Sequence, residues 1–525
     1  MFTKSQFLAP LLALPYTLAA PTNRSISWVD CSQDVGVPAE CGSLPVPLDY
    51  MDEASGKTLN LSMLKVKANK EPVKGSIFIN PGGPGNDAQS FLGLFGREML
   101  VMTGGHFNVI GVDPRGTGKT LPVNCFGTPL ELISAGLQLP PAIDAYDTAL
   151  GTTFAVSKVI ADSCYENLGE VGGLIGTAYT ARDILQVVDA LGEDGMLRYW
   201  GQSYGTVLGA TLAAMFPDRI DRLVIDGVAN IHDYTDGWEY DNLGVGELAL
   251  QEFLKSCVKA GEEACPLASK GSSADELFAI INDLAEQVRH EPIVLGSNVT
   301  TDIVGFAQIT GSLDISLRIS VEYAPYLAGY LNAVLDRNAT AYHTYRSFLF
   351  PDNSSPSTGA EATFAIRCSD SVFRANELSD VEERAARLTA ASRLFGGGYG
   401  SSYMTCSQWR VNAKGRYEGD FKAKTKNPAL IIGSPYDLRT PLKSAVNASA
   451  SLEGSVVLQH NGHGHCVLYS PGQCAIKAVQ DYFTNGTLPA PGTVCEQDFD
   501  VFSGKGVRDS FGTSSKADNE TSTAA

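Results

Sequence analysis

One segment of the chain carries the residue types of a serine nucleophile. Residues 197–206 read LRYWGQSYGT, where an apolar run meets Gly201-Gln202-Ser203-Tyr204-Gly205 and a helical pattern follows. Glycines two positions either side of the serine permit a strained strand-to-helix turn that lifts the hydroxyl clear of a sheet. The motif alone can arise by chance, but the strand before it and the helix after it favour a nucleophile over an inert turn serine. We predict Ser203 as the nucleophile.

Two further side chains would complete this chemistry. A serine hydroxyl needs an imidazole to take its proton, and the imidazole needs a carboxylate to hold it. Asp437 in YDLRTP and the histidines of HNGHGH (460–465) each follow an apolar run. We predict His465 as the base, since its flanking glycines let the loop reach back, with His463 as the alternative and His460 as a strand-end residue. Without the serine and the histidines, Asp437 would be an ordinary turn aspartate.

The charged intermediate of acyl transfer needs two backbone N–H donors. We expect one from Tyr204, directly after the nucleophile, and one from the loop PGGPG (81–85), with Gly83 as first candidate and Gly82 as second. The histidine cluster could instead bind zinc, but Cys466 is an ambiguous ligand and no carboxylate is adjacent, so we predict no metal. No nucleotide or flavin pattern is present, and no cofactor is expected.

Eight short apolar runs would position these residues. Most end in Gly- or Pro-rich loops, and helical patterns separate several of them, which predicts a mostly parallel α/β sheet with its site at the strand carboxyl ends. The order serine, acid, histidine along the chain is that of α/β-hydrolases, so we predict that fold with an eight-stranded sheet. The runs are 44–48, 59–66, 75–80, 107–112, 197–200, 223–225, 428–432 and 455–459.

Helix-start motifs and changes in composition predict how the chain is divided into parts. Thr180-x-x-Asp183, Ser273-x-x-Glu276 and Ser379-x-x-Glu382 resemble capping boxes at helix starts. Strand patterns fade where helical ones dominate, and the end of the chain is polar with few large apolar residues. The expected parts are a signal peptide (1–20), a first part of the core (21–228), an inserted helical cap (229–404), a C-terminal part of the core (405–503) and a disordered tail (504–525).

Several features predict a secreted, extracellular protein. Lys4, the apolar run 7–18 and Ala19-Ala20 are typical of a signal peptide, and the run is too short to span a membrane; a buried N-terminal helix is the alternative. The eleven cysteines include three pairs spaced like short disulfide loops, Cys31–Cys41, Cys257–Cys265 and Cys474–Cys495. Sequons for N-glycosylation begin at Asn23, Asn60, Asn298, Asn338, Asn353, Asn447, Asn485 and Asn519.

The formal net charge of −19 limits the kinds of binding partner that the protein can have. Nucleic acid and anionic membrane surfaces would be repelled, so we exclude both. The charge fits a protein that works in mildly acidic surroundings, or one that is simply kept in solution. The polar end of the chain predicts no GPI-type lipid anchor.

Seven motifs together resemble a known family: ECGSLPVPLDY (40–50), NPGGPG (80–85), DPRGTGKT (113–120), YWGQSYGT (199–206), AIRCSD (365–370), YDLRTP (436–441) and GHGHC to GTVC (462–495). The chain is similar to the secreted tripeptidyl aminopeptidase-like α/β-hydrolases, relatives of the proline iminopeptidases. The resemblance implies the triad Ser203, Asp437 and His465, a C-terminal module with the last two, and release of short peptides or single residues from free N-termini. Gln202 replaces a residue that is often small in the family.

The family pattern, together with loop spacing, also implies the pairs Cys125–Cys164 and Cys368–Cys406 and leaves Cys466 free. An exopeptidase must bind a substrate ammonium, and a partly desolvated carboxylate is the group that does so. Asp370 is the first candidate, because Cys368 would hold its backbone, and Glu239 is the second. The plain alternative is a solvated loop aspartate.

We therefore predict a secreted serine hydrolase that acts as an exopeptidase on peptide or small acyl substrates. The same triad would also serve a secreted carboxylesterase or thioesterase, since acyl transfer does not distinguish ester from amide. A non-catalytic binding protein on the same fold is the third possibility, which an intact triad disfavours.

Overall fold

The structure is a computed structural model that describes residues 25–31, 35–298, 301–350 and 359–512. The predicted signal peptide lies outside these residues, as do three of the sequon asparagines, Asn23, Asn353 and Asn519.

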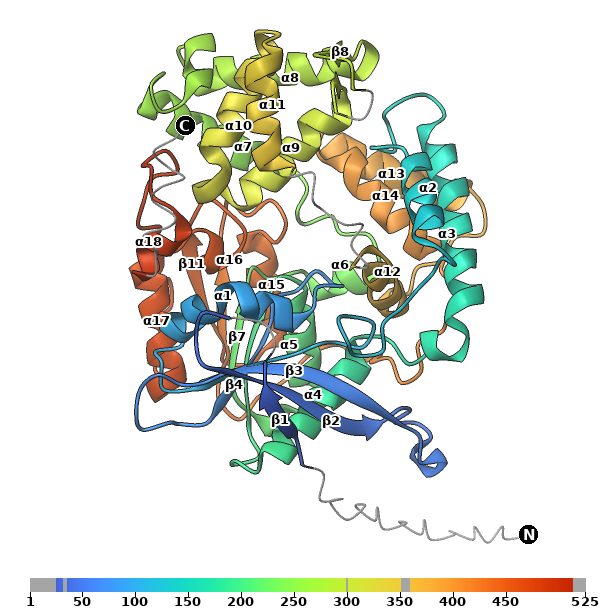
Figure 1. The fold of residues 1–525 in the computed structure, drawn as a ribbon, viewed down its shortest axis with the longest axis vertical. Helices are drawn as coiled ribbons and strands as arrows, with labels where there is room; N and C mark the ends of the chain where they lie inside the picture. The colour runs from blue at the N-terminus through green and yellow to red at the C-terminus, as the bar shows by residue number, and fades with distance from the viewer. Residues whose placement is uncertain (1–24, 32–34, 299–300, 351–358, 513–525) are drawn as a thin grey trace, which may run out of the picture.

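A ten-stranded sheet forms the centre of the lower part of the molecule (Figure 1). The first three strands are antiparallel to their neighbours, and all pairings from β5 to β12 are parallel, so the mostly parallel α/β sheet is confirmed. In spatial order the strands are β1 (Ser27–Asp30), β2 (Ala39–Pro47), β3 (Thr58–Val66), β5 (Asn108–Val112), β4 (Ser76–Asn80), β6 (Leu197–Gln202), β7 (Ile220–Asp226), β10 (Leu430–Gly433), β11 (Val456–Asn461) and β12 (Val494–Glu496).

The predicted eight strands are two too few. Both additional strands lie at the edges of the sheet, where β1 has four residues and β12 has three. Most of their side chains are not buried, so neither strand carries the apolar alternation by which a strand is recognised in a sequence.

Helices cover both faces of the sheet. Alternate residues of one strand face opposite ways, and in β4 Ile77 and Ile79 belong to one buried cluster while Phe78 belongs to another. The Ile77 side packs against α1 (Ala88–Met102) and α17 (Gln473–Asn485). The Phe78 side packs against α4 (Thr177–Leu191), α5 (Tyr204–Met215) and α15 (Leu442–Ser451).

A long helical insertion separates β7 from β10. In Figure 1 the helices α7 to α11 lie above the sheet, while α13 and α14 lie beside α2 (Pro129–Gln138) and α3 (Ala149–Gly172). The inserted elements are α6 (Ile231–Asp236), α7 (Val245–Ala260), α8 (Ala274–His290), β8 (Ile293–Val294), β9 (Ile303–Val304), α9 (Phe306–Arg318), α10 (Ser320–Leu335), α11 (Ala339–Leu349), α12 (Gly359–Asp370), α13 (Ser379–Ala391) and α14 (Gly396–Ser407).

Three local predictions about helix ends have different outcomes. Ser273 does cap α8, because its hydroxyl accepts from the Glu276 N–H. Ser379 is the first residue of α13 and makes no capping bond. Thr180 lies inside α4, which begins three residues earlier. Asp183 resembled the acid of a capping box, but its buried carboxylate pairs with Arg115 instead (2.7 Å).

The disordered tail was predicted to begin at residue 504, which is too early. Residues Val507–Phe511 form α18, and both terminal side chains of this helix are buried against the core. They are spaced i and i+4, which places them on one face, but five residues are too few to show a helical pattern in the sequence. The short helix α16 (Cys466–Tyr469) follows the loop 462–465 after β11 and precedes α17.

Five disulfides join the described cysteines, and all five predicted pairs are confirmed. Cys466 is free and buried, as predicted. The pairs are Cys31–Cys41, Cys125–Cys164, Cys257–Cys265, Cys368–Cys406 and Cys474–Cys495.

Candidate active site

Ser203 occupies a sharp turn between β6 and α5. Its φ of 56° is a conformation that non-glycine residues rarely adopt, and such strain is common at functional sites. Gly201 and Gly205 are required because other backbone atoms lie too close for a side chain. A Cβ on Gly201 would collide with the Gly205 carbonyl oxygen, and one on Gly205 would collide with the Asn80 carbonyl oxygen. The turn therefore has the geometry predicted for a nucleophile.

Asp437 and His465 are in direct contact. The Asp437 Oδ2 lies 2.8 Å from His465 Nδ1, and the acid is fully buried. The backbone N–H groups of Arg439 and Thr440 donate to Oδ1 at 2.9 and 3.0 Å, and the Thr440 hydroxyl donates to Oδ2. Burial would raise the pKa of Asp437, but His465 and these donors together hold it below its usual value. The carboxylate is thus ionised and fixed against the imidazole.

Ser203 and His465 each lie beside the carboxyl end of β7. The Ser203 N–H donates to the carbonyl oxygen of Asp226 (3.2 Å), and His465 Cε1 lies 3.3 Å from the position of a Cβ on Gly227. Within the described residues no hydrogen bond joins Ser203 Oγ to His465. Catalytic hydrogen bonds are often long or poorly aligned in a free enzyme and tighten when a substrate binds.

The other two histidines point elsewhere. The His463 ring lies edge-on to Tyr436, with centroids 5.1 Å apart. His460 is buried within β11, where its Nε2 lies 2.6 Å from the Ser470 carbonyl oxygen. Burial lowers the pKa of both rings. The structure therefore brings His465, and neither of the others, to the acid.

The loop 81–85 lies directly over the nucleophile turn. A Cβ on Gly82 would lie 2.7 Å from the Ser203 Cβ and 2.8 Å from the Tyr204 nitrogen. The Gly82 N–H itself donates to Asn80 Oδ1 (3.0 Å), so it is already engaged. The Tyr204 N–H belongs to the first turn of α5, where backbone donors have no partner within the helix. The Tyr204 N–H is therefore more available to an oxyanion than the Gly82 N–H.

The inserted helices hold the histidine loop in place. The carbonyl oxygen of Arg318, the last residue of α9, accepts from the His465 N–H (2.8 Å), and Ile319 pairs with Gly464 as an antiparallel bridge. Asp314 lies between Arg318 (3.0 Å) and Arg439 (2.8 Å). This ion-pair group was not predicted. In the sequence it is marked by the i, i+4 spacing of Asp314 and Arg318 and by Arg439, two residues after Asp437.

Asp226 is a second missed residue. Its carboxylate is buried at the end of β7, where the Val467 N–H donates to both oxygens (3.2 and 3.1 Å). Burial raises the pKa of Asp226 to about 7, and the nearby Asp437 carboxylate adds to this effect. Its place at a strand end next to Gly227 was visible in the sequence, but burial was not.

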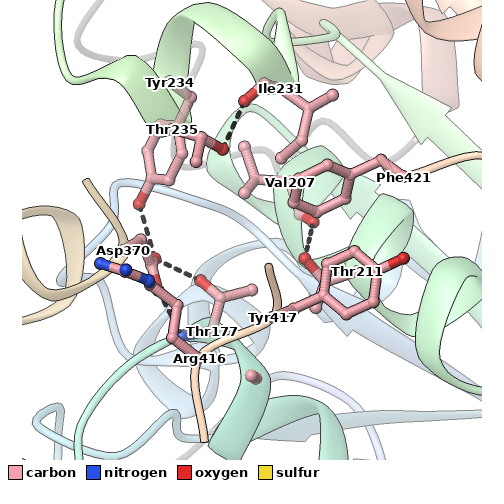
Figure 2. A pocket seen from close by; sticks show the side chains of 11 residues that line it. Thr177, Val207, Thr211, Ile231, Tyr234, Thr235, Asp370, Arg416, Tyr417 and Phe421 are labelled. Atoms are coloured by element: carbon pink, nitrogen blue, oxygen red, sulfur yellow. Dashed lines mark hydrogen bonds between the residues drawn. The ribbon is translucent and has the colours of Figure 1, made fainter. Parts of the chain in front are cut away.

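The two candidate ligands of a substrate amine are both engaged. Asp370 ends α12 and accepts from the Thr177 N–H (2.9 Å), the Thr177 hydroxyl (2.6 Å) and the Tyr234 hydroxyl (3.0 Å) (Figure 2). The adjoining cavity of about 20 Å³ holds little more than a water molecule. Glu239 is partly buried and paired with Arg367. A substrate ammonium would have to displace a donor at either carboxylate.

Among the residues that the structure describes, no group of three or more His, Cys, Asp and Glu side chains could hold a metal ion. In the same ranges, no helix combines the length and the apolar character needed to cross a bilayer.

Comparison with known proteins places the chain. Two protein-family models match the chain. The model described as "alpha/beta hydrolase fold" matches residues 75–253, and the model described as "TAP-like protein" matches residues 392–495. The tripeptidyl aminopeptidase of Streptomyces lividans is 26% identical over 494 residues, 91% of this chain and 88% of its own length. The chain has the α/β-hydrolase fold and is similar to the tripeptidyl aminopeptidases. The resemblance carried by the seven motifs, and the α/β-hydrolase fold, are thus confirmed.

Other relatives of this hydrolase have different names. The serine protease Hip1 of Mycobacterium tuberculosis (strain ATCC 25618 / H37Rv) is 26% identical over 487 residues, 90% of this chain and 91% of its own length. Carboxylesterase B of the same organism is 25% identical over 495 residues, 89% of each chain. The chain is therefore an enzyme of the serine hydrolase and peptidase family. Ser203 falls in the hydrolase-fold match, and Asp437 and His465 fall in the TAP-like match.

Proposed function

We propose that this hydrolase is a secreted exopeptidase that releases short peptides or single residues from free N-termini, with Ser203, His465 and Asp437 as its catalytic triad. The observation that carries the proposal is the Asp437–His465 contact of 2.8 Å beside a serine held at positive φ. Relatives named as peptidases support the substrate class.

The mechanism follows from these positions. His465 Nε2 takes the proton of Ser203 Oγ as the oxygen attacks the substrate carbonyl carbon, while Asp437 stays ionised and stabilises the imidazolium. The N–H groups of Tyr204 and Gly83 receive the negative charge that develops on the carbonyl oxygen. The imidazolium then protonates the leaving amine as the C–N bond breaks. Water, deprotonated by His465, attacks the acyl-enzyme carbonyl, and the acid product leaves with Ser203 restored.

We assign the substrate amine to Glu239 ahead of Asp370. Glu239 keeps 14% of its side chain exposed, whereas Asp370 is buried with both oxygens bonded inside the protein. Tyr403 connects Glu239 to the triad. Arg367, which pairs with Glu239, lies over the Tyr403 ring, and Tyr403 stacks with Tyr399 with ring centroids 6.4 Å apart. Arg439, whose N–H donates to Asp437, lies over the Tyr399 ring. These contacts form a continuous path from Glu239 to Asp437.

Secretion is part of the proposal. Five disulfides are the bonds that an oxidising compartment preserves. All the described sequon asparagines are exposed, as glycan attachment requires: Asn60, Asn298, Asn338, Asn447 and Asn485. We also propose that residues 1–20 form a signal peptide and that 229–404 form a cap domain on a core built from 21–228 and 405–512, which includes α18.

A secreted carboxylesterase is the second candidate, favoured by the relative named carboxylesterase B. A panel of fluorogenic peptides with free or acetylated N-termini, measured beside simple esters, separates the two. The proposal predicts a higher kcat/KM on free-amine peptides than on acetylated peptides and esters. Ser203→Ala should be inactive on all of these substrates, and Glu239→Gln should lose activity selectively on the free-amine peptides. Better hydrolysis of blocked peptides and esters by the unmodified enzyme would show that it is an esterase.

A further inference from the structure

The side chain of Tyr204 is tied into a buried network. Its hydroxyl lies 2.6 Å from Thr177 Oγ1, which lies 2.6 Å from Asp370 Oδ2. Thr177 begins α4, and its N–H donates to the other carboxylate oxygen of Asp370 (2.9 Å). All three side chains are more than nine-tenths buried. The residue expected to supply an oxyanion N–H is therefore connected by two hydrogen bonds to the end of α12.

Burial raises the pKa of Asp370 to about 6, so at neutral pH the carboxylate is ionised and sets the direction of these bonds. An ionised carboxylate only accepts, so the Thr177 hydroxyl must donate its single proton to Asp370. Thr177 Oγ1 can then only accept from Tyr204, whose hydroxyl becomes the donor. Hydrogen bonds to a charged group are stronger than those between neutral groups, which makes this chain of donors rigid.

The far end of the network is anchored as well. The Tyr234 hydroxyl donates to Asp370 Oδ2 (3.0 Å), as Figure 2 shows. Two residues before Asp370, Cys368 forms the disulfide that joins α12 to Cys406 in α14. The carboxylate is thus held by Thr177 of α4 and Tyr234 of α6 (Ile231–Asp236), and both of its oxygens are bonded inside the protein.

We propose that Asp370 is a positioning residue: through Thr177 it holds the Tyr204 side chain and thereby aims the Tyr204 backbone N–H at the oxyanion. The inference rests on the proposed function for the role of this N–H. Tyr204 also follows Ser203 directly, so one anchored side chain fixes both the nucleophile turn and the oxyanion donor. The consequence is a role in every acyl transfer at this site, whether or not the substrate has a free amine.

The test compares Tyr204→Phe and Asp370→Asn with Asp113→Asn. Asp113 is a matched control: it too is a buried carboxylate whose pKa burial raises to about 6, but its partners are Gln89 and the Lys119 N–H. We expect Tyr204→Phe and Asp370→Asn each to lower kcat about 10-fold with KM within about twofold, since a misplaced donor loses part of the ~10²-fold effect of an oxyanion contact. Asp113→Asn should keep the activity of the unmodified enzyme.

Two readouts separate positioning from amine binding and from general damage. The loss should be equal on a simple ester and on a free-amine peptide, and the double variant Tyr204→Phe/Asp370→Asn should lose no more than Asp370→Asn alone. Unchanged kcat in Tyr204→Phe, multiplied losses in the double variant, or a loss in Asp370→Asn confined to free-amine peptides would each overturn the inference. If the unmodified enzyme cleaves only esters, the exopeptidase proposal fails while this inference is still tested on the ester.

Discussion

Replacing Asp226 by Asn should change how stability depends on pH. The carboxylate is 1% exposed, and burial raises its pKa from 3.8 to about 7. Between these values the folded protein keeps a proton that the unfolded chain has already lost. The free energy of unfolding therefore falls as the pH rises from about 4 to about 7.

The size of the effect follows from the displacement of the pKa. Each tenfold change in proton affinity is worth about 1.36 kcal/mol, so a displacement of about three pH units corresponds to about 4 kcal/mol. The amide side chain of the Asp226→Asn variant does not titrate, so the variant lacks this decline. Relative to the unmodified protein, the variant should therefore gain stability as the pH rises, by up to about 4 kcal/mol between about pH 4 and about pH 8.

The assay is the urea midpoint, followed by tryptophan fluorescence at several pH values for both proteins. Burial also raises the pKa of Asp113 and Asp370, each to about 6, but these groups are present in both proteins and cancel in the difference. A difference that stays constant with pH, or that shrinks as the pH rises, would refute the reasoning about Asp226.

Three further predictions concern the triad, the cysteines and the glycans. Ser203→Ala and His465→Ala should lose several orders of magnitude in kcat while staying folded, Asp437→Asn should lose nearly as much, and His463→Ala should stay near the unmodified rate; the reverse result for the two histidines would move the base to His463. Peptide mapping without reduction should find the five disulfides and a free Cys466 that reacts with thiol reagents only after unfolding, whereas a Cys466–Cys474 bond would contradict the pairing. Glycosidase treatment of the secreted protein should lower its mass and convert asparagines such as Asn338 and Asn485 to aspartate, and no mass change would count against secretion through a glycosylating pathway.

Local patterns were sufficient to predict the central strands of the sheet and the strand-to-helix turn at Ser203. The buried strands β4, β5 and β6 are short apolar runs, and a strand followed by Gly-x-Ser-x-Gly has few structural alternatives. His465 could be preferred to His463 only through the glycines around it, and the structure gives the physical reason: the His465 N–H is held by the Arg318 carbonyl oxygen.

Features that depend on distant contacts could not be predicted. The edge strands β1 and β12 carry no pattern of their own, because neighbouring strands define them. Asp183 looked like a capping acid, yet its partner Arg115 lies 68 residues away in the chain. Asp370 was predicted to bind the substrate because it lies two residues after Cys368. No local pattern indicated that Thr177, 193 residues earlier, would donate hydrogen bonds to both of its carboxylate oxygens.

The central claim is that Ser203 is an activated nucleophile in a site that recognises a free N-terminus. The most direct measurement is labelling by a fluorophosphonate probe, located by mass spectrometry and repeated in the presence of a free-amine peptide or its acetylated form. We predict a single adduct on Ser203, absent in His465→Ala, with protection by the free-amine peptide and much less by the acetylated one. An adduct on another residue, or no adduct in the folded protein, would contradict the assignment of the nucleophile, and equal protection by both peptides would contradict recognition of the amine.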